Sequence, residues 1–115
     1  MDIEAIRKTC LSFEQVTEDV KWGHDLVFQV GGKMFCVAGL DRLPVTVSFK
    51  VPEELFEEIS ARLHFRPAPY VAKYKWVLLE DAAMVPPREL QEFFRQSYEL
   101  VREKLAPKIK KQLGL

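Results

Sequence analysis

The chain has 115 residues, of which 48% are hydrophobic and 30% charged, and its 17 basic side chains balance 17 acidic ones. A chain of this length forms one domain whose core needs neither a metal nor a disulfide. Zero net charge gives no whole-chain attraction to nucleic acid, and no apolar run approaches the roughly 20 residues of a membrane span. The N-terminal segment opens with acidic residues and lacks the layout of a signal peptide, so we expect a cytoplasmic protein.

The first half of the chain predicts one helix and then four strands. Apolar residues at helical spacing predict a helix over 2–13, and Asp2 is placed to cap its amino end. Alternating apolar and polar residues then predict strands over 16–22, 26–30, 33–39 and 45–50. In the last of these, Val45, Val47 and Phe49 point to one face while Thr46, Ser48 and Lys50 point to the other.

Between the second and third strands stands the pair Gly31-Gly32. Two adjacent glycines can adopt the positive φ angles of a two-residue hairpin turn, which is reason enough for both of them. We therefore expect a tight hairpin with Lys33 projecting from its tip. A lysine there is either simply solvated or placed to meet a phosphate.

The second half predicts a helix, a loop, a strand and a long helix. Pro52 suits a first helical turn, and an apolar stripe follows it at Leu55, Phe56, Ile59 and Leu63. Two prolines mark 64–74 as a loop, and 75–80 reads as the fifth strand. Pro86 and Pro87 open the last helix, which carries a buried stripe and ends before Pro107. That stripe comprises Leu90, Phe93, Phe94, Ser97, Val101 and Leu105.

The predicted order of elements is α-β-β-β-β-α-β-α. Consecutive strands joined by short turns predict an antiparallel meander, and the helices are expected to cover one face of it. The fold class is therefore an α+β two-layer domain over residues 1–106, followed by a basic and frayed tail over 107–115.

Charge is distributed unevenly along the chain. Residues 1–60 hold 6 basic and 11 acidic side chains, whereas residues 61–115 hold 11 and 6. This asymmetry either concentrates a positive field on one face or disappears when the two halves interleave in the fold.

Cations and aromatic rings alternate in the segment HFRPAPYVAKYKW, which begins at His64. Bases stack on aromatic rings while cations hold the phosphate backbone, so such alternation is found on nucleic-acid-binding surfaces. Phe65 and Trp76 can instead be core residues, and we expect this of Trp76 because it lies in an apolar strand. The candidate contacts that remain are Arg66, Tyr70, Lys73, Tyr74 and Lys75, together with Lys33 and Lys50 on the exposed side of the sheet.

No catalytic, metal or cofactor site is predicted. His24 lies beside Asp25, but no nucleophile or oxyanion donor is recognisable near them, and no phosphate-binding glycine loop occurs. The glutamates at 53, 54, 57 and 58 are better explained as a solvated face that complements a helix dipole than as a cation site. Cys10 and Cys36 lie in apolar segments without a metal-binding spacing, so we expect two buried, reduced thiols.

Four segments together resemble the MmcQ/YjbR-like proteins. They are WGHDLVFQVGGKMF, VSFKV, APYVAKYKWV and SYELV, and they occur in the family's order over about residues 16–101. The resemblance implies a CyaY-like α+β fold of the "double wing" type, DNA binding, and no catalytic residues. It points to Lys33, Lys50, Lys73 and Lys75 as basic residues of the sheet and its rim. The frataxin-type iron site that the fold also evokes needs an acidic first helix, and DIEAIRKTC has only two acids.

The sequence thus predicts a non-enzymatic domain that binds DNA through its open sheet face and hairpin tips. The alternative is a module that docks a protein or a small ligand on the same face. Convergence of the lysines would favour DNA. Interruption of that patch by Glu18, Asp25 or Glu80 would favour the alternative.

Overall fold

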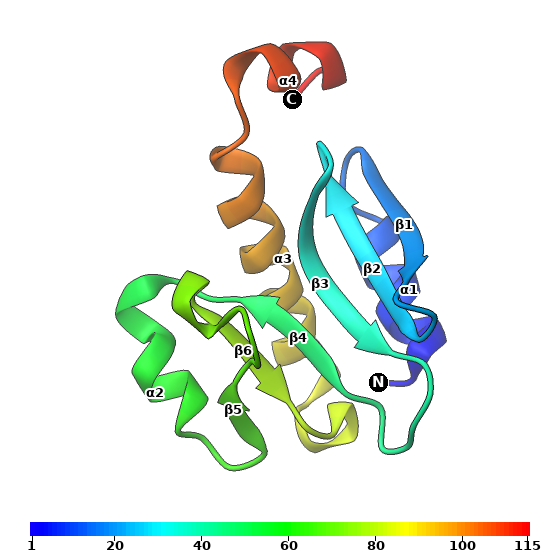
Figure 1. The fold of residues 1–115 in the computed structure, drawn as a ribbon, viewed down its shortest axis with the longest axis vertical. Helices are drawn as coiled ribbons and strands as arrows, with labels where there is room; N and C mark the ends of the chain where they lie inside the picture. The colour runs from blue at the N-terminus through cyan, green and yellow to red at the C-terminus, as the bar shows by residue number, and fades with distance from the viewer.

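The computed structural model describes residues 1–115, which fold as two layers (Figure 1). The helices are α1 Ile3–Leu11, α2 Phe56–Ser60, α3 Pro87–Glu103 and α4 Pro107–Leu113. The strands are β1 Val16–Lys21, β2 Asp25–Val30, β3 Lys33–Gly39, β4 Val47–Lys50, β5 Phe65–Pro67 and β6 Trp76–Leu79. Short 3-10 turns cover Glu53–Leu55, Ala72–Tyr74 and Ala82–Met84.

The sheet is antiparallel throughout, in the order β1-β2-β3-β4-β6-β5. The predicted α+β class is confirmed, and the first four strands form the expected meander. The prediction of five strands is wrong, because Phe65–Pro67 of the expected loop forms β5 at the sheet edge. A proline is tolerated there because an edge strand leaves one row of backbone groups unpaired. In Figure 1, α1 and α3 lie behind the sheet and its open face is turned toward the viewer.

The covered face of the sheet holds the core, as the alternation in β4 predicts. Val47 and Phe49 are fully buried, and the Phe49 ring packs against Phe65, Phe93 and Phe94 with centroids 5.1 to 6.5 Å apart. Val45 precedes β4 and is only partly buried. A well-packed aromatic cluster of this kind fixes α3 across the sheet.

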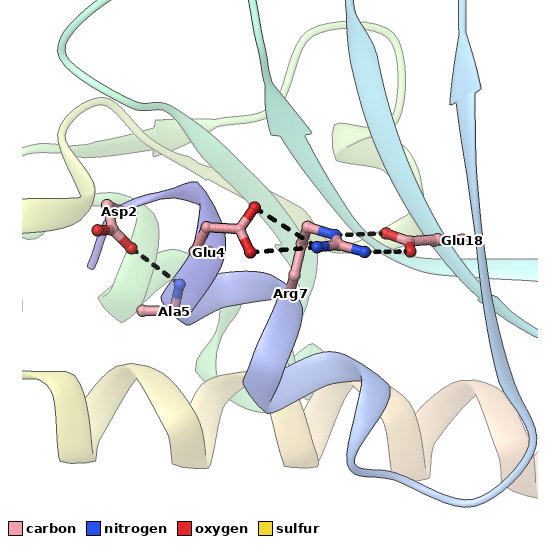
Figure 2. Close-up of polar contacts among 5 residues, drawn as sticks. All are labelled: Asp2, Glu4, Ala5, Arg7 and Glu18. Carbon is pink, nitrogen blue, oxygen red and sulfur yellow. Dashed lines mark hydrogen bonds and ion pairs between the residues drawn. The ribbon is translucent and has the colours of Figure 1, made fainter.

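Helix α1 is capped and tied to the sheet by charged groups (Figure 2). The Asp2 carboxylate accepts a hydrogen bond from the Ala5 amide at 2.8 Å, as the predicted N-cap requires. Arg7 donates through Nε and Nη2 to the two oxygens of Glu18 at 2.8 and 2.6 Å, and it also contacts Glu4. The hydrogen bond from Arg7 lowers the pKa of the Glu18 carboxyl below its ordinary value. This bidentate pair joins α1 to β1 on the covered side.

Two helix predictions need correction. Helix α2 ends at Ser60, so Leu63 lies beyond the apolar stripe and is 82% exposed. Residues 107–115 were expected to fray, but Pro107 begins α4, because proline suits a first helical turn as well as it ends a helix.

The Gly31-Gly32 corner is the predicted two-residue turn. Both glycines have positive φ, +57° and +79°, and Val30 pairs with Lys33 across the turn. A Cβ atom on Gly31 would lie 2.8 Å from the Leu105 side chain and 3.1 Å from that of Ile109. The hairpin tip is thus packed against the end of α3 and against α4 rather than free in solvent.

Both cysteines are fully buried, as predicted. Burial raises the pKa of the Cys36 thiol well above its ordinary value. None of the helices is both long enough and apolar enough to cross a bilayer.

Candidate ligand-binding groove

The open face of the sheet carries a hollow with an apolar floor. Cross-strand register places Val37 beside Ser48 and Ser48 beside Leu78, and all three point away from the core. Trp76 lies on the same face, opposite Lys50, and is almost completely buried. These strands and the loops beside them enclose about 510 Å³, to which Met34 and Val71 contribute further apolar surface. The face of the sheet predicted to be exposed to solvent is therefore apolar along its centre.

Two aromatic residues border this hollow from different loops. Trp22 lies in the turn between β1 and β2 and is 63% exposed, and Tyr70 lies between β5 and β6 and is 98% exposed. Both have positive φ, +55° and +67°, a conformation that costs bulky side chains roughly 1–2 kcal/mol. Strained positions of this kind cluster at functional sites.

One end of the groove is polar and carries both signs of charge. This end encloses about 590 Å³ and shares six lining residues with the apolar hollow, which are His24, Asp25, Val37, Ser48, Pro69 and Tyr70. Four of its ionisable side chains pair locally, His24 with Asp25 and Arg42 with Asp41, each at 3.9 Å. The other residues that can donate or accept hydrogen bonds there are Thr46, Arg66 and Glu80.

The other end is a smaller hollow of about 290 Å³ that contains three lysines and no acid. Lys33, Lys50 and Lys104 line it, with Met34, Val71, Tyr74, Trp76, Val101 and Leu105 around them. Lys50 Nζ donates to the Tyr74 carbonyl at 2.7 Å. Burial, and next the charge of Lys104, lower the pKa of Lys50 from its ordinary value.

This lysine end exists because β3 and β4 separate. Their pairing runs from Ala38 with Val47 to Cys36 with Phe49 and no further, and α3 is visible in the gap in Figure 1. Ser97 of α3 bridges the strands where they part. Its hydroxyl donates to the Phe35 carbonyl at 2.6 Å and accepts from the Lys50 amide at 2.9 Å.

Comparison with known proteins identifies the family. The model of the YjbR family matches residues 11–100. The chain belongs to the YjbR family. No curated protein matches the sequence.

Two solved structures are similar to this YjbR chain. The Deinococcus radiodurans protein DR2400, with a DUF419 domain, has a TM-score of 0.87 and 28% identity, covering 98% of this chain and 88% of that one. A Pseudomonas syringae protein has a TM-score of 0.73 and 16% identity, covering 88% of this chain and 99% of that one. The second likeness concerns the fold alone.

Of the seven residues singled out from sequence, five lie along the groove of this YjbR domain. They are Lys33, Lys50, Arg66, Tyr70 and Tyr74. The other two do not line it. Lys73 Nζ lies 5.2 Å from the Tyr74 ring centroid, and Lys75 Nζ lies 5.2 Å from that of Phe56, the first residue of α2. The backbone explains this for Lys75, which has φ of +68° just before β6 and so leaves the strand alternation.

Sequence reasoning missed two important groove residues. Trp22 was read as the end of a strand, although its place in a WGHD turn could have indicated exposure. Lys104 follows α3 in sequence and reaches the groove only through the gap between β3 and β4. Of the acids expected to interrupt a basic patch, Asp25 and Glu80 line the polar end, whereas Glu18 is engaged by Arg7.

Proposed function

We propose that the groove of this YjbR domain binds a short segment of single-stranded DNA. The observation that carries the proposal is the position of Trp22 and Tyr70, two exposed rings that border an apolar hollow with Trp76 in its floor. Unpaired bases stack on such rings with about 1–3 kcal/mol per base, whatever their sequence. The lysine end then supplies cations for the backbone.

A single strand suits the groove better than a duplex. A duplex keeps its bases inside and offers the protein mainly phosphates. Across the open face those phosphates would meet Asp25, Asp41 and Glu80 at the polar end. A single strand offers its bases to the apolar centre and needs cations only at the lysine end.

The charge count sets the expected salt dependence. Three lysines line the basic end, so a hydroxyl-ended strand can have at most about three phosphates neutralised there, and each contributes about 0.7 to the slope of log K against log salt. We therefore expect a slope of roughly −2. A protein of zero net charge should show this shallow slope rather than the steep one of a strongly basic DNA-binding protein.

Intrinsic fluorescence provides the test. The chain has two tryptophans, Trp22 and Trp76, and both line the groove, so stacked bases should quench the emission. Oligo(dT) should quench it saturably, and a blunt duplex of the same length should bind at least about tenfold more weakly, since it lacks the stacking contribution.

A matched pair of variants locates the contact. Trp22→Ala should weaken oligo(dT) binding by roughly tenfold, the equivalent of one lost stacking contact. Leu63→Ala removes an even more exposed apolar side chain, which lies after the end of α2 and outside the groove, and should leave binding unchanged. Equal affinity of Trp22→Ala and wild type for oligo(dT) would contradict the proposal.

A second candidate is docking of a protein segment. It is favoured by the two acids Asp25 and Glu80 at the polar end, and by the fact that exposed Trp and Tyr are typical anchors of protein interfaces. This candidate predicts that no oligonucleotide quenches the tryptophans at low salt, with the fold intact.

A further inference from the structure

The lysine end has an unbalanced charge. Lys33, Lys50 and Lys104 line one small hollow, and none of them has a carboxylate within ion-pair distance. The one polar contact of the Lys50 ammonium is the Tyr74 carbonyl, which leaves two of its three N–H groups free. The charge of Glu53 raises the pKa of Lys50, but by less than the charge of Lys104 lowers it.

The surroundings make this imbalance costly. Met34, Trp76, Val101 and Leu105 line the hollow beside the lysines. Lys50 is partly buried there, so its charge is screened less from the other two than it would be in water, whereas Lys33 and Lys104 are exposed. The carbonyl end of α3 offsets part of this repulsion, but it cannot neutralise three ammonium groups. An anion held between the lysines would relieve it.

We propose that this hollow binds the terminal phosphate of a DNA strand, an inference that rests on the single-strand function proposed above. A phosphate inside the strand carries one negative charge, whereas a terminal monoester carries about 1.5 to 2 at pH 7 and offers three acceptor oxygens. Three lysines around one small hollow match the monoester better.

The shape of this end supports a chain terminus rather than a chain passing through. Val101 in the last turn of α3 and Leu105, which follows that helix, line the hollow. Leu105 is itself in contact with the Gly31 corner, so α3 and the hairpin tip are joined behind it. Figure 1 shows the tip of the β2–β3 hairpin and the connection from α3 to α4 at the same end of the molecule. The lysine hollow shares lining residues with the apolar hollow and none with the polar end, so it is one end of the groove and a strand that starts at the lysines can run along the groove from there.

The test compares three oligo(dT) molecules of one length, with a 5′-phosphate, with a 3′-phosphate and with hydroxyls at both ends. One of the two phosphorylated strands should bind at least about tenfold more tightly than the unphosphorylated strand, as two or more added charge-assisted hydrogen bonds require. Inorganic phosphate should compete away this increment and weaken the binding of the hydroxyl-ended strand less, because that strand keeps its stacking contacts in the apolar hollow.

Charge-neutral variants assign the effect to the hollow. Lys50→Gln and Lys104→Gln should abolish the ratio between phosphorylated and unphosphorylated strands. Lys33→Gln should also abolish this ratio, and it should not disturb the fold because Lys33 is exposed. Lys8→Gln removes the same charge from α1 behind the sheet and should preserve the ratio.

The outcomes separate the two proposals. Equal binding of all three strands would overturn the terminal-phosphate site and leave single-strand binding in place. Absence of binding by every strand would overturn the proposed function and the site together. A ratio that survives all three hollow variants would place the phosphate elsewhere and overturn this assignment.

Discussion

The Ser97→Ala variant tests how much one hydroxyl stabilises the place where β3 and β4 separate. Ser97 is the only polar side chain among the fully buried ones, and it bridges the Phe35 carbonyl and the Lys50 amide. Ser97→Ala leaves both backbone groups without a partner. Each backbone group left without a hydrogen-bond partner lowers the free energy of unfolding by about 1–3 kcal/mol if water cannot reach it.

The expected loss of stability depends on how deeply each of the two hydrogen bonds of Ser97 is buried. The Phe35 contact is fully buried and should carry its full cost, while the Lys50 contact is partly buried and can recover some energy from water. Alanine also gains a few tenths of a kcal/mol as a better helix former in α3. The free energy of unfolding should fall by about 2–4 kcal/mol, a large part of the roughly 5–15 kcal/mol typical of a domain.

Urea unfolding followed by circular dichroism measures this loss. The midpoint should fall without a change in the slope of free energy against urea, and the melting temperature should drop by roughly 10–20 °C. Ser60→Ala is the matched control, because the Ser60 hydroxyl makes an exposed bond to the Glu57 carbonyl within α2. That change should stay within about 0.5 kcal/mol. A comparably small loss for Ser97→Ala would refute the reasoning.

Two further predictions concern the hairpin corner and the pH dependence of stability. Gly31→Ala should lower the free energy of unfolding by about 1–3 kcal/mol more than Gly32→Ala in the same urea assay. Both glycines have positive φ, but only at Gly31 would a Cβ meet the Leu105 side chain. Equal losses of stability would mean that the tip is not packed against Leu105. Arg7 holds the pKa of Glu18 below the ordinary 4.5, so its stabilising effect is fully present above about pH 4.5 and is lost as pH falls through the folded-state pKa. Glu18→Gln should therefore flatten the acid side of a plot of stability against pH, whereas Glu14→Gln, at a carboxylate without an ion pair, should leave its shape intact.

The sequence predicted most of the fold because one face of the sheet is buried. Strict alternation such as that of Val47 and Phe49 leaves one register compatible with a packed core. Elements whose stability comes from distant contacts escaped prediction. Strand β5 has three residues and no alternation to detect, and it forms by pairing with β6. Helix α4 is anchored by Ile109 beside the Gly31 corner, a contact that sequence spacing does not reveal.

The groove was less predictable than the fold. Residues of the strands, such as Lys50, could be assigned to the open face from alternation alone. The rims depend on loop conformation, and positive φ at Trp22 and Tyr70 has no sequence signal in residues other than glycine or asparagine. The basic end depends on Lys104, which reaches the open face of the sheet only because β3 and β4 separate. Charge convergence across such a gap can be seen only in three dimensions.

The order of strands also determines how this domain can meet other molecules. An unpaired sheet edge invites another chain to add a strand, and proteins discourage this with proline, charge or shortness. At one edge, β5 has three residues and contains Pro67. At the other, β1 carries Glu18 and Asp19 in its centre. Both borders are thus protected against strand addition and the aggregation that follows from it.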